Sequence, residues 1–258
     1  MLLKTTFIFI GSILGYFFIF LFFPLLWIQG IYLKKVVLRL PTPRDSPFGK
    51  VKGNKGVIKI LGIGESTMAG VGIINHAETL TGLTAQTLSQ SIGSNVDWRI
   101  IAQNGLTLKN LNKLLIEKKF SDIDLIFIAV GGNDVFNLTA PWVWRKDIIN
   151  CLKILKNYNK SPLIIFSPVP CVGRFPAIPK PLSLVFGYWE FLLQEYLSLV
   201  VCLIENVQLL EERFPDGEEF FMSDGIHPSA LSYKLWSTKL STLAIEYLQK
   251  YNSNSAQT

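Results

Sequence analysis

The apolar run Asp124-Leu-Ile-Phe-Ile-Ala-Val130 leads directly into Gly131-Gly132-Asn133-Asp134. A short, continuous apolar run that ends in glycines predicts a strand buried on both faces and followed by a tight turn. The same arrangement occurs upstream, where the run 57–63 leads into Gly64-Glu65-Ser66-Thr67. Strands of this kind are typical of parallel sheets, in which functional groups gather at the carboxyl ends of the strands.

Strand-like and helix-like segments alternate on both sides of these runs. Further strands are predicted at 96–102, 162–168 and 207–210, and helices at 77–92, 106–119, 142–158, 184–204 and 229–251. Strands separated by helices imply right-handed crossovers and a parallel sheet covered on both faces. The sequence therefore predicts an α/β domain over 56–251.

Two more polar turns accompany this pattern. Asn104-Gly105 follows the strand 96–102, and Asp224-Gly225-Ile226-His227-Pro228 precedes the last helix. A carboxylate three residues before a histidine can orient the imidazole and stabilise its protonated form, as an activated serine requires. Each motif alone also has an ordinary explanation: Ser66 can cap a helix, Asn104-Gly105 can be a simple turn, and Asn133 can sit in an Asx turn.

Together the four motifs resemble the SGNH (GDSL-like) hydrolase family, with its four blocks in order. The resemblance implies a flavodoxin-like three-layer sandwich and a serine esterase or lipase. It assigns Ser66 as nucleophile, His227 as general base and Asp224 as the residue that orients it. The implied oxyanion hole consists of the Ser66 and Gly105 N–H groups and the Asn133 side-chain amide. Glu65 departs from the family, which usually has Asp before the serine.

The α/β-hydrolase fold fits less well. Its nucleophile turn reads Gly-x-Ser-x-Gly, and Met68 stands where the second glycine belongs. Its acid and histidine also normally come from separate loops.

Composition narrows the remaining classes. The 258 residues include three scattered cysteines and two histidines, which argue against a disulfide framework and against a metal site. The net charge of +6 favours anionic surfaces, but no basic motif typical of nucleic-acid binding occurs. We expect chemistry that needs no metal and no cofactor, and no nucleic-acid partner. The sequence does not indicate an oligomeric state.

The N-terminus carries most of the excess apolar character. No charged residue occurs from Thr5 to Leu33, and about 20 apolar residues suffice to cross a bilayer. The run is too long for a signal peptide, so residues 1–40 are predicted to be an uncleaved membrane anchor; a shallow insertion that never crosses fits the same residues. The basic flank of Lys34, Lys35, Arg39 and Arg44 favours a cytoplasmic catalytic domain. Residues 41–55 are predicted to be a linker and 252–258 a polar tail.

The resulting prediction is a membrane-anchored esterase or lipase that hydrolyses carboxylic esters through an acyl-enzyme, on a lysophospholipid or another acyl lipid. Acyl transfer on the same fold and a non-catalytic membrane-anchored binding protein are the alternatives. His76 is predicted to have a structural or surface role. The segment 168–181, with its prolines and Phe175, is either an acyl-binding loop or a stiff connector.

Overall fold

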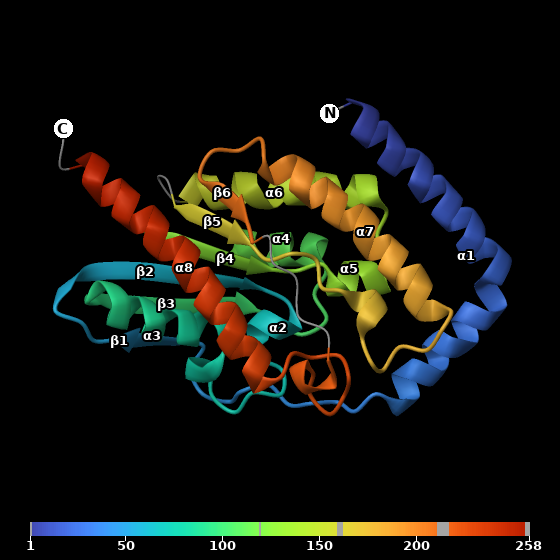
Figure 1. Ribbon diagram of the computed structural model, residues 1–258, viewed down its shortest axis with the longest axis horizontal. Coiled ribbons are helices and arrows are strands. Elements are labelled where there is room, and N and C mark those ends of the chain that lie inside the picture. The colour runs from blue at the N-terminus through green and yellow to red at the C-terminus, as the bar shows by residue number, and fades with distance from the viewer. Residues whose placement is uncertain (1, 119, 159–161, 211–216, 256–258) are drawn as a thin grey trace.

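The computed structural model describes residues 2–118, 120–158, 162–210 and 217–255. Its centre is a six-stranded sheet with the order β1-β3-β2-β4-β5-β6 (Figure 1). The strands are β1 (Phe48–Val51), β2 (Lys55–Gly64), β3 (Ser94–Ala102), β4 (Leu125–Ala129), β5 (Leu163–Phe166) and β6 (Val207–Leu209). Strands β2 to β6 pair in parallel, and β1 pairs antiparallel with β3. This confirms the predicted α/β fold.

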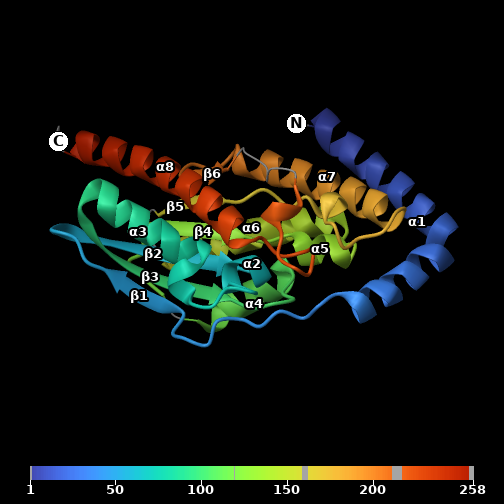
Figure 2. The same cartoon turned by 60° about the horizontal axis from the view of Figure 1, so that its bottom comes forward.

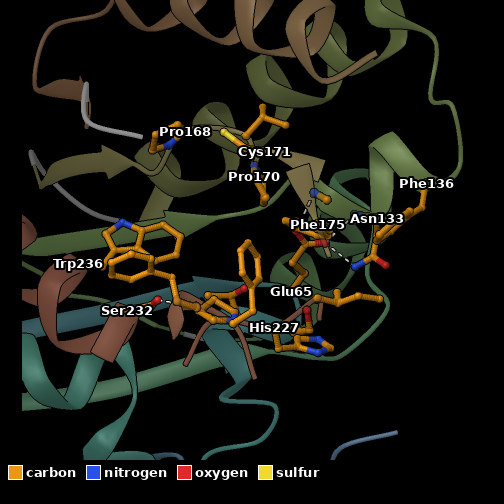
Figure 3. A pocket seen from close by; sticks show the side chains of 18 of the residues that line it. Glu65, Asn133, Phe136, Pro168, Pro170, Cys171, Phe175, His227, Ser232 and Trp236 are labelled. Atoms are coloured by element: carbon orange, nitrogen blue, oxygen red, sulfur yellow. Dashed lines mark hydrogen bonds between the residues drawn. The ribbon is translucent and has the colours of Figure 1, made fainter. Parts of the chain in front are cut away.

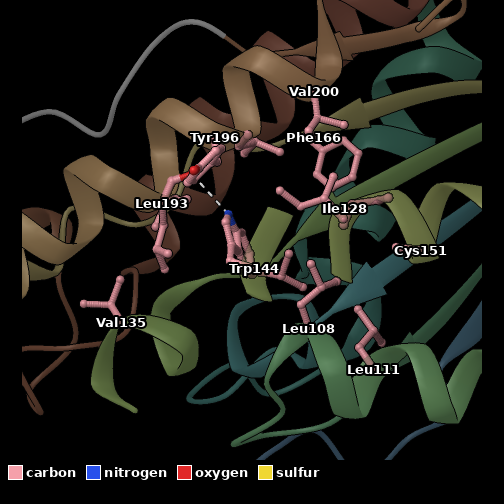
Figure 4. Close-up of a cluster of buried hydrophobic side chains, with 14 of the residues drawn as sticks. Leu108, Leu111, Ile128, Val135, Trp144, Cys151, Phe166, Leu193, Tyr196 and Val200 are labelled. Carbon is pink, nitrogen blue, oxygen red and sulfur yellow. Dashed lines mark hydrogen bonds between the residues drawn. The ribbon is translucent and has the colours of Figure 1, made fainter. Parts of the chain in front are cut away.

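Helices cover both faces of the sheet because successive strand residues point to opposite sides. Phe127 packs with the cluster under α3 (Leu80–Ile92) and α8 (Ala230–Ser255). Its neighbours Ile126 and Ile128 pack on the other face, under α4 (Leu108–Glu117), α6 (Pro141–Tyr158) and α7 (Leu182–Val201). Figure 4 shows the second cluster, in which the buried Trp144 indole donates to Leu193 O at 3.1 Å.

Five short helices lie in the loops between these elements. They are α2 (Ser66–Ala69), η1 (His76–Glu78), α5 (Gly132–Phe136), η2 (Val172–Arg174) and η3 (Glu218–Phe220). Two of them begin at or next to the glycine-containing turns that follow β2 and β4.

The N-terminal helix α1 (Leu2–Val36) runs along the outside of the domain, beside α7 (Figures 1 and 2). Among the described residues, two helical stretches are long and apolar enough to span a membrane, 3–36 and 182–201. The most apolar window of the first is 17% buried and that of the second 61%. Helix α7 is therefore a core helix of the domain, whereas α1 exposes most of its apolar surface.

The segment between α1 and the α/β domain is closely attached to that domain. Pro41 O accepts from Gly72 N at 2.7 Å, and Pro47 O accepts from Ile100 N at 2.8 Å. Strand β1 adds to the edge of the sheet, where a Cβ on Gly49 would lie 2.6 Å from the Trp98 ring. The three prolines and two glycines of this segment predict a linker at 41–55, and the four-residue strand within it is too short to show a pattern in the sequence. We call residues 41–54 the strap.

Candidate active site

The polar turns meet at one edge of the sheet, where the strand order reverses. Strand β2 lies between β3 and β4, so the loops that follow β2 and β4 leave in opposite directions and open a crevice. A cavity of about 500 Å³ occupies this place. Ser66, Asn104, Asn133 and His227 all line it, and Figure 3 shows several of its side chains. The structure thus brings together residues that are up to 161 positions apart in the chain.

Asp224 and His227 form a hydrogen-bonded pair on one loop. His227 Nδ1 lies 2.5 Å from Asp224 Oδ2, and the Asp224 side chain is fully buried. The other carboxylate oxygen accepts from the backbone N–H groups of Ile226 and His227, each at 3.0 Å. Gly225 supplies the positive φ of 65° that this tight loop requires. The carboxylate favours a proton on Nδ1, which leaves Nε2 to act as a base.

The Asp224–His227 loop is tied to the rest of the domain. Met222 N donates to His227 O at 2.8 Å, and the hydroxyl of Ser232 on α8 donates to Phe220 O at 2.6 Å. The loop that carries the imidazole is therefore anchored to the start of α8.

Ser66 is the first residue of α2, directly after β2. Glycine is required before it, since a Cβ on Gly64 would lie 2.2 Å from Ala129 O. From behind, the buried Tyr233 hydroxyl donates to Thr67 O at 2.7 Å. These contacts hold the half-buried serine at the carboxyl edge of the sheet, as the sequence predicts.

Glu65 connects the turn after β2 to the turn after β4. Its carboxylate accepts from Gly132 N at 2.8 Å, from Asn133 N at 2.9 Å and from the Asn133 side-chain amide. Burial raises the pKa of Glu65 to about 7, although these donors favour the ionised form. The Asn133 amide has two hydrogens, so one can bind Glu65 while the other serves the cavity.

A second buried carboxylate lies just after Asn133. Asp134 accepts from Leu108 N at 2.8 Å and from the Thr139 hydroxyl at 3.1 Å. Its burial, together with the nearby negative charges of Glu65 and Asp147, raises the pKa of Asp134 to about 7. This residue connects the turn after β4 to the start of α4.

Gly105 lies beside the cavity, next to the lining residue Asn104. Its φ is 82°, a conformation that favours glycine, and a Cβ there would meet nothing within 4 Å. The backbone at this position is therefore open to a bound molecule.

Most of the cavity wall is apolar. The segment 168–181 forms part of this wall and is more than a connector. Its lining residues are Pro168, Val169, Pro170, Cys171 and Phe175. The Phe175 ring lies 5.6 Å from the Phe221 ring and 6.4 Å from the Phe136 ring. Phe220, Phe221 and Trp236 also line the cavity, although no motif in the sequence marks them as site residues. For Phe220 and Phe221, the sequence offers one indication: they lie four and three residues before Asp224.

His76 lies elsewhere, on η1. Its Nδ1 is 2.7 Å from Asp45 Oδ1 in the strap, and its backbone N–H donates to the same carboxylate. This contact holds the strap against the domain, in line with the structural role expected for His76.

Comparison with known proteins places the fold. Neither a protein-family model nor a curated protein matches the chain. Solved structures do: a lipase from a goat rumen metagenome (TM-score 0.56, 17% identity) covers 72% of this chain and 96% of its own. A lipase/acylhydrolase from Enterococcus faecalis (0.52, 21%) covers 72% and 94%. A salicylyl-acyltransferase from a tetracycline biosynthetic pathway (0.52, 13%) covers 73% and 55%. Other solved structures that match are described as G-D-S-L family lipolytic proteins, from Desulfitobacterium hafniense and Veillonella parvula, so this chain has the fold of the SGNH (GDSL-type) lipolytic proteins.

Proposed function

We propose that the protein hydrolyses carboxylic esters through a covalent acyl-enzyme on Ser66. The observation that carries this proposal is the Asp224–His227 pair, whose carboxylate is buried and whose imidazole lines the same cavity as a serine at the start of a helix. Nε2 of His227 takes the Ser66 proton as the hydroxyl attacks the ester carbonyl, and Asp224 stabilises the imidazolium. The proton then passes to the leaving alcohol. Water, activated by the same base, releases the acid.

The oxyanion of each tetrahedral intermediate needs donors that are already in position. We assign this role to the backbone N–H groups of Ser66 and Gly105 and to the side-chain amide of Asn133. The contact between Glu65 and Asn133 supports the assignment, because it fixes the amide before substrate binds. The open backbone at Gly105 is compatible with it.

The aromatic wall supports an acyl lipid as substrate, such as a lysophospholipid. Phe136, Phe175, Phe221 and Trp236 give the cavity an apolar surface for an acyl chain. Helix α1 is apolar enough to hold the enzyme at a membrane, where such lipids are found. Its C-terminal basic flank is attracted to anionic lipids, which are enriched in the cytoplasmic leaflet, and this favours the cytoplasmic side for the catalytic domain.

A fluorophosphonate probe tests the proposal directly. It reacts only with an activated serine, so we expect the purified full chain to be labelled at Ser66 and to hydrolyse p-nitrophenyl esters. The Ser66→Ala variant should be neither labelled nor active while it keeps the wild-type circular dichroism spectrum. An unlabelled wild-type protein would favour the alternative of a non-catalytic membrane-anchored binding protein.

Acyl transfer is the second candidate, because one protein of this fold is described as an acyltransferase. Both reactions share the acyl-enzyme and differ in what attacks it. Product analysis in the presence of graded alcohol acceptors separates them. A hydrolase gives mainly free acid at every acceptor concentration, whereas a transferase gives mainly the new ester at low acceptor concentration.

A further inference from the structure

The face of helix α1 that packs on the domain contains the small residues Gly11, Ser12 and Gly15 together with larger ones such as Ile8 and Tyr16. Ile8 and Ser12 are fully buried. Gly11 and Gly15 allow the helix to lie close to α7, since a Cβ on either would come within 3.0 Å of the Tyr188 side chain. The Tyr16 ring packs edge-on against Trp189, with centroids 4.7 Å apart. This inner face has the composition of helix–helix contacts inside membrane proteins.

Specific polar contacts fix both ends of α1 to α7, which runs in the opposite direction. Near the N-terminus, Lys4 pairs with Glu195 at 2.8 Å, and the Tyr188 hydroxyl donates to Gly11 O at 2.9 Å. Near the other end, the Gln29 side chain donates to Lys180 O at 2.7 Å and accepts from Leu182 N at 3.1 Å. Helix α1 is therefore a docked part of the domain.

The outer face of α1 is exposed and apolar along its length. Its most exposed large side chains are Leu3, Phe7, Leu14, Phe17, Phe20 and Leu21. The apolar surface continues onto the neighbouring elements. Leu184, Tyr188 and Phe191 form an exposed stripe on α7, and Trp142 at the start of α6 packs against Phe9 on the other flank. An apolar patch this large is typical of a membrane or partner contact.

We propose that α1 lies in one leaflet of a lipid bilayer and does not cross it, with the α7 stripe and Trp142 at the same surface. The 35 residues of α1 extend about 50 Å, more than the roughly 30 Å hydrocarbon core. Because α1 is docked on α7 over residues 4–16 and again at Gln29, a crossing α1 would draw α7 and the sheet into the hydrocarbon. The ion pair of Lys4 and the exposed Lys34 and Lys35 instead place both ends in the headgroup region.

The occupant of this face is a bilayer and not a second protein, on two grounds. Every large side chain on the outer face is apolar over more than 20 consecutive residues, as lipid contact requires. The exposed basic side chains Lys34, Lys35 and Arg39 lie at the end of this face, where they suit anionic headgroups. The inference concerns membrane placement and does not depend on the proposed hydrolysis.

Cysteine labelling in sealed vesicles tests whether α1 crosses. Cys151 is buried and Cys202 exposed, so the Cys171→Ser variant reports on Cys202. The next residue, Leu203, lines a small hollow together with Thr5, near the N-terminus of α1. A second variant adds Cys202→Ser and Leu3→Cys. A membrane-impermeant maleimide should label positions 3 and 202 from the same side of the membrane. Labelling from opposite sides would establish a spanning helix and overturn the proposal.

The depth of side chains in the bilayer tests whether α1 and the α7 stripe lie at the same membrane surface. A fluorophore on Phe191→Cys should be quenched by spin-labelled lipids in anionic vesicles, as should one on Phe17→Cys. A matched control is Ile116→Cys on α4, also exposed but far from this face, which should stay bright. Quenching at position 17 alone would mean that α1 leaves α7 and acts as a tether, which contradicts the proposal. Quenching at neither position, with cross-links between copies, would assign the face to a second copy.

Discussion

Two His–Asp pairs with almost the same geometry occur in this chain. In each, Nδ1 of the ring faces a carboxylate, at 2.5 Å for His227–Asp224 and at 2.7 Å for His76–Asp45. The surroundings differ. The Asp224 side chain is fully buried, whereas that of Asp45 is 42% exposed. His227 lines a cavity shared with Ser66, whereas His76 is buried against the strap.

This difference shows that a His–Asp hydrogen bond does not by itself identify a catalytic pair. Around Asp224, burial removes competing water, and backbone donors fix the carboxylate. Around Asp45, solvent weakens the electrostatic part of the interaction, and the pair joins two segments of the chain. The proposed catalytic role therefore depends on what the ring faces and not on the pair.

Replacing the two histidines gives the largest expected contrast. His227→Ala should lower kcat about 10⁴–10⁶-fold with the fold intact, because the serine loses its base. His76→Ala should leave kcat within a few-fold and should reduce the free energy of unfolding by about 1–3 kcal/mol through lost burial and hydrogen bonds. Ester turnover and urea unfolding of both variants measure this. Equal losses of kcat in the two variants would contradict the assignment of a catalytic role to His227 and a structural role to His76.

Replacing the two aspartates tests the same distinction more finely. In Asp224→Asn an amide N–H faces Nδ1, which forces the ring proton onto Nε2 and removes the base; we expect a loss of about 10⁴-fold in kcat. Asp45→Asn is the matched control and should retain near-wild-type kcat. If Asp224→Asn also stayed active, Asp224 would not be orienting His227.

Removal of one proposed oxyanion donor, the Asn133 amide, should have an intermediate effect on kcat. If the Asn133 amide binds the oxyanion, Asn133→Ala should lower kcat about 10²–10³-fold with KM nearly constant. Steady-state kinetics on a soluble ester measures both constants. A rise in KM at unchanged kcat would assign Asn133 to substrate binding.

The smallest expected effect is a difference in how stability depends on pH, between Glu65 at the cavity and Asp45 in the strap. The pKa of Glu65 near the cavity is raised to about 7, above its ordinary 4.5, so its contribution to stability is present below pH 4.5 and lost as pH rises to about 7. For Asp45, partial desolvation raises the pKa, but the hydrogen bonds from His76 outweigh it, and the net effect is a lowered pKa. The contribution of Asp45 to stability is therefore lost only as the pH falls below 3.8, the ordinary pKa of this carboxyl.

Urea unfolding between pH 4.5 and 7 should therefore respond to one carboxylate and not to the other. Glu65→Gln should flatten the decline in stability by up to about 1.4 kcal/mol per pH unit, the limit for one proton. Asp45→Asn should leave this slope unchanged. An unaltered slope in Glu65→Gln would mean that Glu65 is already ionised at pH 5.

The sequence predicts the parts of the fold and site that local pattern encodes. The buried strands and the glycine-containing turns that follow them are visible as runs of residue type, and parallel pairing then brings Ser66, Asn133 and their neighbours to one edge. The pairing of Asp224 with His227 follows from their spacing of three residues.

The remainder depends on contacts between distant segments. Nothing near Glu65 in the sequence indicates that its carboxylate binds the turn at Gly132 and Asn133, 67 and 68 residues away. Trp236 enters the cavity wall only because α8 packs across the sheet. Strand β1 has no visible alternation, and it forms because β3 offers an unpaired edge.

The strap has a consequence for how the domain can be separated from α1. Strand β1 covers the outer edge of β3, whose N–H and C=O groups would otherwise be open to pairing with another molecule. A protein cut before Gly56 would lose β1, the Asp45–His76 contact and the Pro41 and Pro47 hydrogen bonds together. Such a fragment would expose the unpaired edge of β3 and would tend to aggregate. A cut between Val37 and Leu40 would leave that edge covered.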